Sequence, residues 1–147
     1  YKGLGLGPPD PNEVKQIGTL GGNPVAAAAG LATLEILQTP GMFENLFSTE
    51  QRLMDGLTAL IAKHGVKGQV RGVPPMFDIL FTDADVKDYR SAAQSDSAML
   101  KVFNEQVLLG GLLKRDNKFY VSTAHTIEDI EEALAICDVA LTAVAKE

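Results

Sequence analysis

The spacing of apolar residues changes along the chain from helical to alternating and back, and this order limits the possible folds more than any other feature. The expected helices are residues 25–37, a second ending near residue 64, 83–93, 96–109 and one from Thr126, and the expected strands are 69–73, 76–82, 112–114 and 118–122. Strands that follow one another directly in the sequence favour antiparallel pairs. The elements do not alternate as βαβ units, so a doubly wound parallel sheet is not expected. The sequence therefore predicts an α+β fold, with helices covering one face of a small antiparallel sheet.

Turn and capping residues set the limits of several of these elements. Asn23 followed by Pro24 is typical of a helix start, because the Asn side chain caps and proline at the first position loses no needed hydrogen bond. Gly65 is a plausible stop for the second helix. Thr126 with Asp129 three residues later predicts a capping box at the last helix, with Asp in the place of Glu.

Length and charge exclude several classes of protein. The 147 residues fit one domain with a core, and the formal net charge of -6 argues against nucleic-acid or anionic-membrane partners. Cys137 is the single cysteine, which predicts an intracellular protein without internal disulfides. No apolar run approaches the ~20 residues that span a bilayer, and no signal peptide is recognisable. The chain begins at Tyr1 rather than methionine, so we expect it to be a piece of a longer protein.

Residues 18–30 carry the strongest functional signal. Glycines, the Thr19 hydroxyl and a helix N-terminus occur together, and such a combination offers backbone N–H groups and a hydroxyl to an anion such as phosphate. From spacing alone, a plain glycine turn before a capped helix is the commoner alternative. Both interpretations are consistent with the residues taken by themselves.

Three segments resemble class III aminotransferases, which use pyridoxal 5'-phosphate (PLP). GTLGGNPVAAAAGLATLEIL (residues 18–37) is similar to the family's GT-x-x-GNP-x-A-x-A-x-x-x-x-L-E segment, with the glutamate-1-semialdehyde 2,1-aminomutase group most alike. MFDILFT (76–82) is similar to its G-x-M-F-x-I-x-F-T strand. VSTAHTIEDI (121–130) is similar to its S-x-A-H-T-x-E-D-I segment. The matches occur in the family's order and extend from Ile17 to the end of the chain.

The resemblance implies a fold type I enzyme that is a cytoplasmic homodimer acting on small amine or amino acid and keto substrates. It implies that Gly18 and Thr19 bind the phosphate of PLP held by the partner subunit, and that Asn23 and Pro24 shape the loop. Residues 1–16 are expected to be a flexible arm or a severed linker. Residues 17–38 are expected to contribute the phosphate loop and a helix to the large domain, and residues 39–147 the C-terminal small domain.

Departures from the family pattern qualify this assignment. Pro74-Pro75 stands where an aminomutase usually has glycine or small residues, and the segment 114–118 lacks the expected Pro-Ser stretch. Both favour a general aminotransferase over an aminomutase. The family's Schiff-base lysine lies a few dozen residues before the Gly-Thr pair, so we expect it outside this chain. The 147 residues alone are then predicted to be inactive, and the rival interpretation is a non-catalytic α+β packing or dimerisation module.

Other candidate residues have simpler interpretations. Lys15 follows a Gly/Pro-rich arm and is expected to be solvated rather than catalytic. His125 and His64 lack carboxylates or cysteines at metal-ligand spacing, so no metal is predicted, and His125 is expected to organise its loop while remaining of interest as a site residue. Arg115 is expected at a surface turn and Cys137 in the core. The acidic residues 128–132 are expected to form a solvated helix start.

Overall fold

The computed structural model describes residues 18, 20–114 and 116–146, and the chain divides after Pro40 into two units. The described part of the first unit is a turn followed by helix α1 (Pro24–Leu37). The second unit contains α2 (Met42–His64), β1 (Gln69–Val73), β2 (Met76–Leu80), α3 (Tyr89–Ala92), α4 (Ser97–Leu109), β3 (Phe119–Tyr120) and α5 (Ile127–Val144). The assignment of residues 17–38 and 39–147 to a large and a small domain remains a prediction, and residues 1–16 lie outside the described part.

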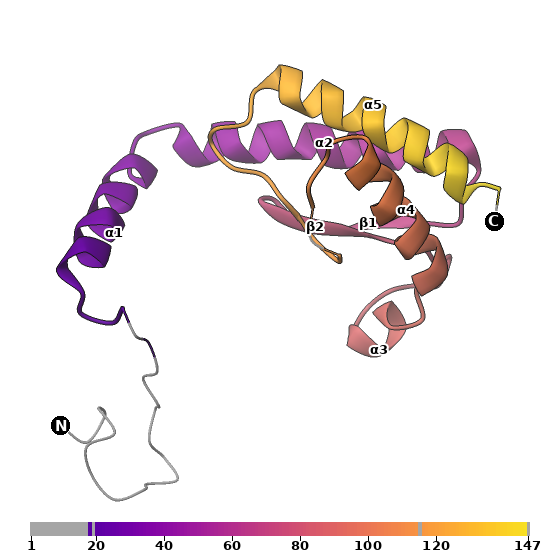
Figure 1. Ribbon diagram of the computed structural model, residues 1–147, viewed down its shortest axis with the longest axis horizontal. Helices are drawn as coiled ribbons and strands as arrows, with labels where there is room; N and C mark the ends of the chain where they lie inside the picture. The colour runs from indigo at the N-terminus through magenta and orange to yellow at the C-terminus, as the bar shows by residue number, and fades with distance from the viewer. Residues whose placement is uncertain (1–17, 19, 115, 147) are drawn as a thin grey trace, which may run out of the picture. The chain divides into compact units, whose positions relative to one another are not determined.

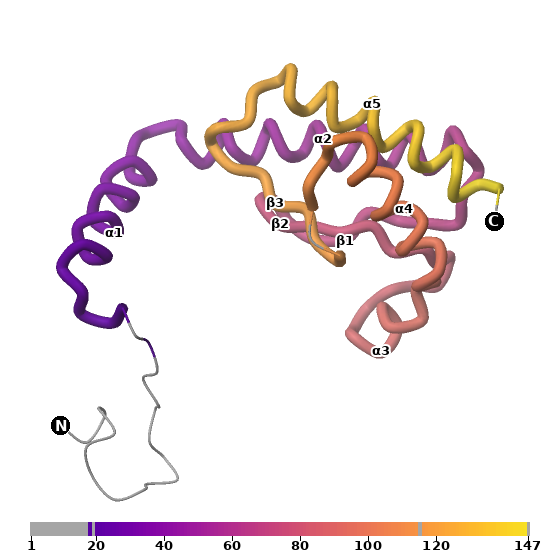
Figure 2. Tube along the Cα trace, in the orientation of Figure 1, coloured from indigo at the N-terminus to yellow at the C-terminus, as the bar shows by residue number. Residues whose placement is uncertain are grey.

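The strands of the second unit form one antiparallel sheet in the order β1-β2-β3 (Figures 1 and 2). In the β1–β2 hairpin Val73 pairs with Met76, so the two intervening prolines make the loop. Gly72 permits this hairpin, because its φ of 141° disfavours other residues and an added Cβ would lie 2.6 Å from the Met76 carbonyl oxygen. The backbone at Gly72 therefore needs glycine.

Helices α2, α4 and α5 pack over one face of this sheet (Figure 1). Alternation along β2 and its continuation buries Phe77, Ile79 and Phe81, whereas Met76 and its cross-strand partner Tyr120 are exposed. One face of the sheet therefore carries the core under the helices, which confirms the predicted α+β class.

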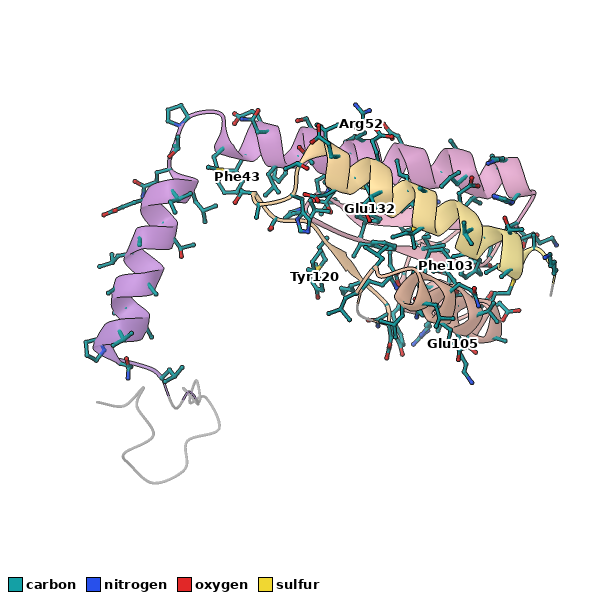
Figure 3. The ribbon with its side chains drawn as sticks, turned by 45° about the horizontal axis from the view of Figure 1, so that its top comes forward. Phe43, Arg52, Phe103, Glu105, Tyr120 and Glu132 are labelled. Atoms are coloured by element: carbon teal, nitrogen blue, oxygen red, sulfur yellow. The ribbon has the colours of Figure 1, made fainter. Side chains whose placement is uncertain are left out.

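Aromatic rings fill the space between the sheet and the helices. Phe77 stacks on Phe119 with 4.9 Å between the ring centroids, and Phe103 of α4 meets Phe81 edge-on at 5.9 Å. Figure 3 shows Phe103 on the inner side of α4 and Glu105 on the outer side. These contacts join β2, β3 and α4 into one core.

Helices α2 and α5 run in the same direction, and contacts between charged side chains join them at two places. Arg52 pairs with Glu131 near one end, and Lys63 and His64 both contact the Asp138 carboxylate near the other. Apolar residues fill the length between them. The buried residues of α5 are Ile130, Ala133, Cys137, Ala140, Leu141 and Val144.

Two expected elements differ from the structure. Of the helix expected over 83–93, only Tyr89–Ala92 is helical, capped by Asp88, whose side chain accepts from the Ser91 N–H. Residues 112–114 form no strand, and β3, within the strand expected over 118–122, pairs with β2. Leu113 is 86% exposed, so a strand there would bury little apolar surface.

Candidate functional site

Two consecutive turns precede helix α1. The Gly21 N–H donates to the Gly18 carbonyl at 3.0 Å, and the Asn23 N–H donates to the Leu20 carbonyl at 3.0 Å. Gly22 takes a φ of 80°, the left-handed region that favours glycine. These turns give the chain the compact, exposed loop that the sequence predicts before the helix.

Asn23 satisfies the first N–H groups of α1. Its side-chain oxygen accepts from the Val25 N–H at 2.9 Å and from the Ala26 N–H at 3.2 Å, while its carbonyl accepts from Ala27. Pro24 at the first helical position has no N–H to satisfy. The predicted cap is therefore confirmed. Because the cap already occupies the helix N–H groups, any anion contact has to come from the loop before them.

Several predicted residues fall where the structure gives no description. Thr19, Lys15 and Arg115 lie outside the described residues. Gly18 is described and is exposed. The assignment of Gly18 and Thr19 to a phosphate contact accordingly remains a prediction.

His125 belongs to the second unit and lies in the loop before α5. Its Nδ1 accepts a hydrogen bond from the Ser122 N–H at 2.9 Å and lies 3.1 Å from the Ser122 hydroxyl. A backbone N–H can only donate, so the neutral ring carries its proton on Nε2. The imidazole thus holds its loop together, as predicted, and keeps Nε2 available.

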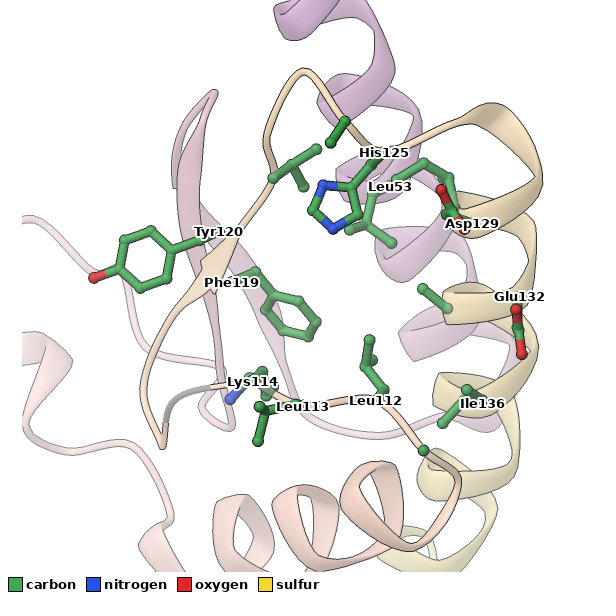
Figure 4. A pocket seen from close by; sticks show the side chains of 15 residues that line it. Leu53, Leu112, Leu113, Lys114, Phe119, Tyr120, His125, Asp129, Glu132 and Ile136 are labelled. Atoms are coloured by element: carbon green, nitrogen blue, oxygen red, sulfur yellow. The ribbon is translucent and has the colours of Figure 1, made fainter. Parts of the chain in front are cut away.

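A cleft of about 390 Å³ opens beside this loop, between α5, the segment 111–121 and Leu53 of α2 (Figure 4). Figure 4 shows the His125 ring directed into the cleft and the Phe119 ring across from it. The apolar floor and the polar groups at the rim are features of a small-molecule site. The structure therefore places His125 in a cleft, and its functional role stays a prediction.

Lys114 lies at this cleft and is almost fully buried. The side chain of Lys114 is only 3% exposed to solvent. Its Nζ lies 3.8 Å from Asp78 Oδ1 and donates a hydrogen bond to Asn104 Oδ1 at 2.8 Å. The ammonium also lies 5.0 Å from the centre of the Phe119 ring. Burial lowers the pKa of Lys114 and raises the pKa of Asp78, and the opposite charge of each partner counteracts the other's shift.

The remaining candidates are structural. His64 Nε2 lies 2.6 Å from Asp138, and the carboxylate of Asp129 completes the capping box with Thr126. Cys137 is fully buried, and burial raises the pKa of its thiol to about 12. Among the described residues, no group of His, Cys, Asp and Glu has a metal-binding arrangement. Within that same part of the chain, no helix has the length and apolar character to cross a bilayer.

Three buried ionisable groups were not predicted from the sequence: Glu50, Asp78 and Lys114. Glu50 has a local signal, because it falls at helical spacing between Leu46 and Leu53 on the apolar stripe of α2. The Asp78–Lys114 pair has none, because it depends on a contact between distant parts of the chain.

Comparison with known proteins agrees with these motifs. Residues 9–141 match the class-III aminotransferase family. Glutamate-1-semialdehyde 2,1-aminomutases of Nitrosomonas europaea and Desulfosudis oleivorans are 38% and 40% identical over 128 and 124 residues. These alignments cover 85% and 82% of this chain, and the chain spans 29% of the length of each relative.

Solved structures show the same architecture. An omega-transaminase from Sphaerobacter thermophilus superposes with a TM-score of 0.81 at 27% identity, covering 89% of this chain and 30% of that one. A glutamate-1-semialdehyde aminomutase from Pseudomonas aeruginosa has a TM-score of 0.76 at 20% identity, covering 92% and 31%. The second likeness concerns the fold, since the identity is low. The motifs, the fold and the family match over residues 9–141 together establish that this chain belongs to the class-III aminotransferase family.

Proposed function

We propose that these residues are part of a PLP-dependent enzyme that transfers an amino group between an amine or amino acid and a carbonyl compound. The family match over residues 9–141 carries this proposal. PLP, when bound, supplies the electron sink for chemistry at the amino-bearing carbon. The contribution of this chain is to bind and orient the cofactor's phosphate and to pack around the reacting groups.

The turn that begins at Gly18 is the proposed phosphate contact. Gly18 is exposed, and the turn is closed by the Gly21 N–H, which donates to the Gly18 carbonyl. Since Asn23 occupies the N–H groups of Val25 and Ala26, it shapes the loop and does not compete for the ligand. Together with the Thr19 hydroxyl, this loop fits a phosphate group in the partner subunit of a homodimer.

The composition of α1 supports assigning it to a large domain. The helix is apolar on all sides, with Glu35 its single charged residue, and none of its residues is buried. A helix of this kind is typical of the interior of a larger protein. Residues 17–38 would then belong to the part that surrounds the cofactor, and the second unit would be the small domain.

A second candidate is glutamate-1-semialdehyde 2,1-aminomutase activity, favoured by the two curated relatives at 38% and 40% identity. Pro74-Pro75 and the segment 114–118 depart from the aminomutase pattern and favour a general aminotransferase. Assays of the longer gene product with glutamate-1-semialdehyde and with a panel of amine donors separate these candidates, because an aminomutase needs no separate keto acceptor.

The test uses the longer gene product and the 147-residue chain side by side. We expect the longer protein to bind PLP and transaminate, and the chain alone to do neither, because its resemblance to the family leaves the cofactor-binding lysine outside it. A denaturing mass spectrum first establishes which polypeptide is assayed. Transamination by the pure 15.7 kDa chain would refute the predicted inactivity of the chain alone and the packing-module alternative alike.

Thr19→Ala in the longer protein tests the phosphate contact. Losing one hydrogen bond to a charged group is expected to weaken PLP retention by about 1.5 kcal/mol, or roughly tenfold, measured by dialysis and absorbance. Thr33→Ala is the matched control, because the Thr33 hydroxyl donates its hydrogen bond to the Ala29 carbonyl at 2.9 Å. Equal retention by the Thr19 variant and the unmodified protein would show that Thr19 does not bind the phosphate.

A further inference from the structure

The buried face of α2 carries one carboxyl group, that of Glu50. Its neighbours along the stripe are Leu46 and Leu53, and Leu57 and Ile61 continue it. Glu50 is 0% exposed, and neither carboxyl oxygen has a hydrogen-bond partner in the described part of the chain. A charged carboxylate without partners is so costly in such a place that the group takes up a proton instead.

The charged groups that face α2 from α5 are engaged elsewhere. Glu131 pairs with Arg52, and Asp138 holds Lys63 and His64. Both carboxylates already have cationic partners, and neither contributes to the pKa shift of Glu50. On this side the helix interface offers no compensation.

The other surroundings of α2 give the same result. On β1, which also packs against α2, the Arg71 Nε donates to Gln69 at 2.7 Å. In the loop before α5, the His125 Nδ1 is bonded to Ser122. Burial alone raises the pKa of Glu50 from 4.5 to about 7, without a contribution from any charged neighbour.

We propose that Glu50 makes the packing of α2 against α5 sensitive to pH. The protonated carboxyl is the form that is compatible with the packed helices. When its proton passes to solvent, the carboxylate requires water, and the turn of α2 between Leu46 and Leu53 loosens from its neighbours. This pH response depends on the carboxyl of Glu50, which is fully buried within an apolar interface and has no hydrogen-bond partner among the described residues.

The direction of the effect follows from the two forms of the group. In the unfolded chain Glu50 ionises near its ordinary pKa of 4.5, so below that pH both states hold the proton and the full stability is present. Between 4.5 and about 7 the unfolded state loses its proton first, and stability falls with rising pH. Above about 7 the folded state ionises too and the loss levels off, at up to about 300-fold in the unfolding equilibrium constant.

Urea unfolding of the 147-residue chain at pH 5 and pH 8 tests this proposal. From the two pKa values of Glu50, the unfolding constant of the wild type should rise about 70-fold more than that of Glu50→Gln over this interval. Glu44→Gln is the matched control, because Glu44 is an exposed carboxylate on the same helix. It should keep the full pH step of the wild type.

The amide of Glu50→Gln also lacks partners and can itself disturb folding, so Glu50→Leu provides a second variant. Leucine continues the apolar stripe, and this variant should be stable at both pH values without the step. Carbon-13 NMR of the Glu50 carboxyl should give a midpoint near 7 in the wild type. A midpoint near 4.5, or the same pH step in Glu50→Leu as in the wild type, would overturn the proposal.

Discussion

Replacing Lys114 with methionine keeps much of the side chain and removes the ammonium 3.8 Å from Asp78. The Asp78 side chain is 11% exposed, and its Oδ1 has no hydrogen-bond partner among the described residues. Without Lys114 the carboxylate is expected to protonate rather than remain charged. Protonation at pH 7 from the ordinary pKa of 3.8 costs about 4 kcal/mol, which sets the upper limit of the effect. Because burial already raises the pKa of Asp78 in the wild type, we expect a loss of about 3 kcal/mol.

The size of this loss depends on pH. At about pH 4 most of the cost disappears, because this pH is close to the ordinary pKa of 3.8 and protonating the carboxylate then costs only about 0.6 kcal/mol. Urea unfolding followed by circular dichroism at pH 7 and about pH 4 measures both values. Lys101→Met is the control, because the Lys101 side chain is 77% exposed on α4. Adding Asp78→Asn to the Lys114 variant should restore part of the stability. An equal loss at both pH values, or no recovery in the double variant, would refute Asp78 as the cause.

Two further predictions concern the backbone and the thiol. Gly72→Ala should lower the unfolding free energy by about 2 kcal/mol or more, because the added Cβ would meet the Met76 carbonyl oxygen at 2.6 Å with φ at 141°. Gly68→Ala, whose nearest contacts are at 3.5 Å, should be close to neutral in the same urea titration. Cys137 in the folded protein at pH 8 should resist a thiol reagent and react after unfolding, because its pKa is about 12 and it is fully buried. Rapid labelling of the native chain would contradict its burial.

Helices α1, α2, α4 and α5 were predictable from the sequence because their signals are local, whereas most of the helix expected over 83–93 does not form. A helix start can be recognised from residues that lie next to each other or three apart, such as Asn23 with Pro24 and Thr126 with Asp129. The structure has both caps. The ends of α2 and α4 likewise coincide with glycines. Local capping chemistry alone was sufficient here.

Strand pairing and buried charge were less predictable because both depend on distant residues. The residues near Lys114 have an apolar run that suggests a strand, yet the ammonium bonds to Asn104 and faces Asp78 of β2 instead. Only Phe119 and Tyr120 pair, and their partner strand is β2. Of the candidate site, the loop and cap before α1 were predictable, whereas the cleft at His125 required the fold.

The α2–α5 interface contains ionisable groups whose pH dependences have opposite signs. Lys63 and His64 lower the pKa of Asp138, so the stability from this contact is fully present above the ordinary pKa of 3.8 and is lost as pH falls through the lower folded-state pKa. Glu50 acts in the other direction, with stability lost between 4.5 and about 7 as pH rises. The two effects together imply a stability maximum on the acidic side of neutrality. Glu50→Leu should remove the decline towards neutral pH and leave the acidic decline intact, because Asp138 and its partners do not contact the substituted side chain through any hydrogen bond. Loss of both declines together would instead mean that the interface titrates as one coupled unit.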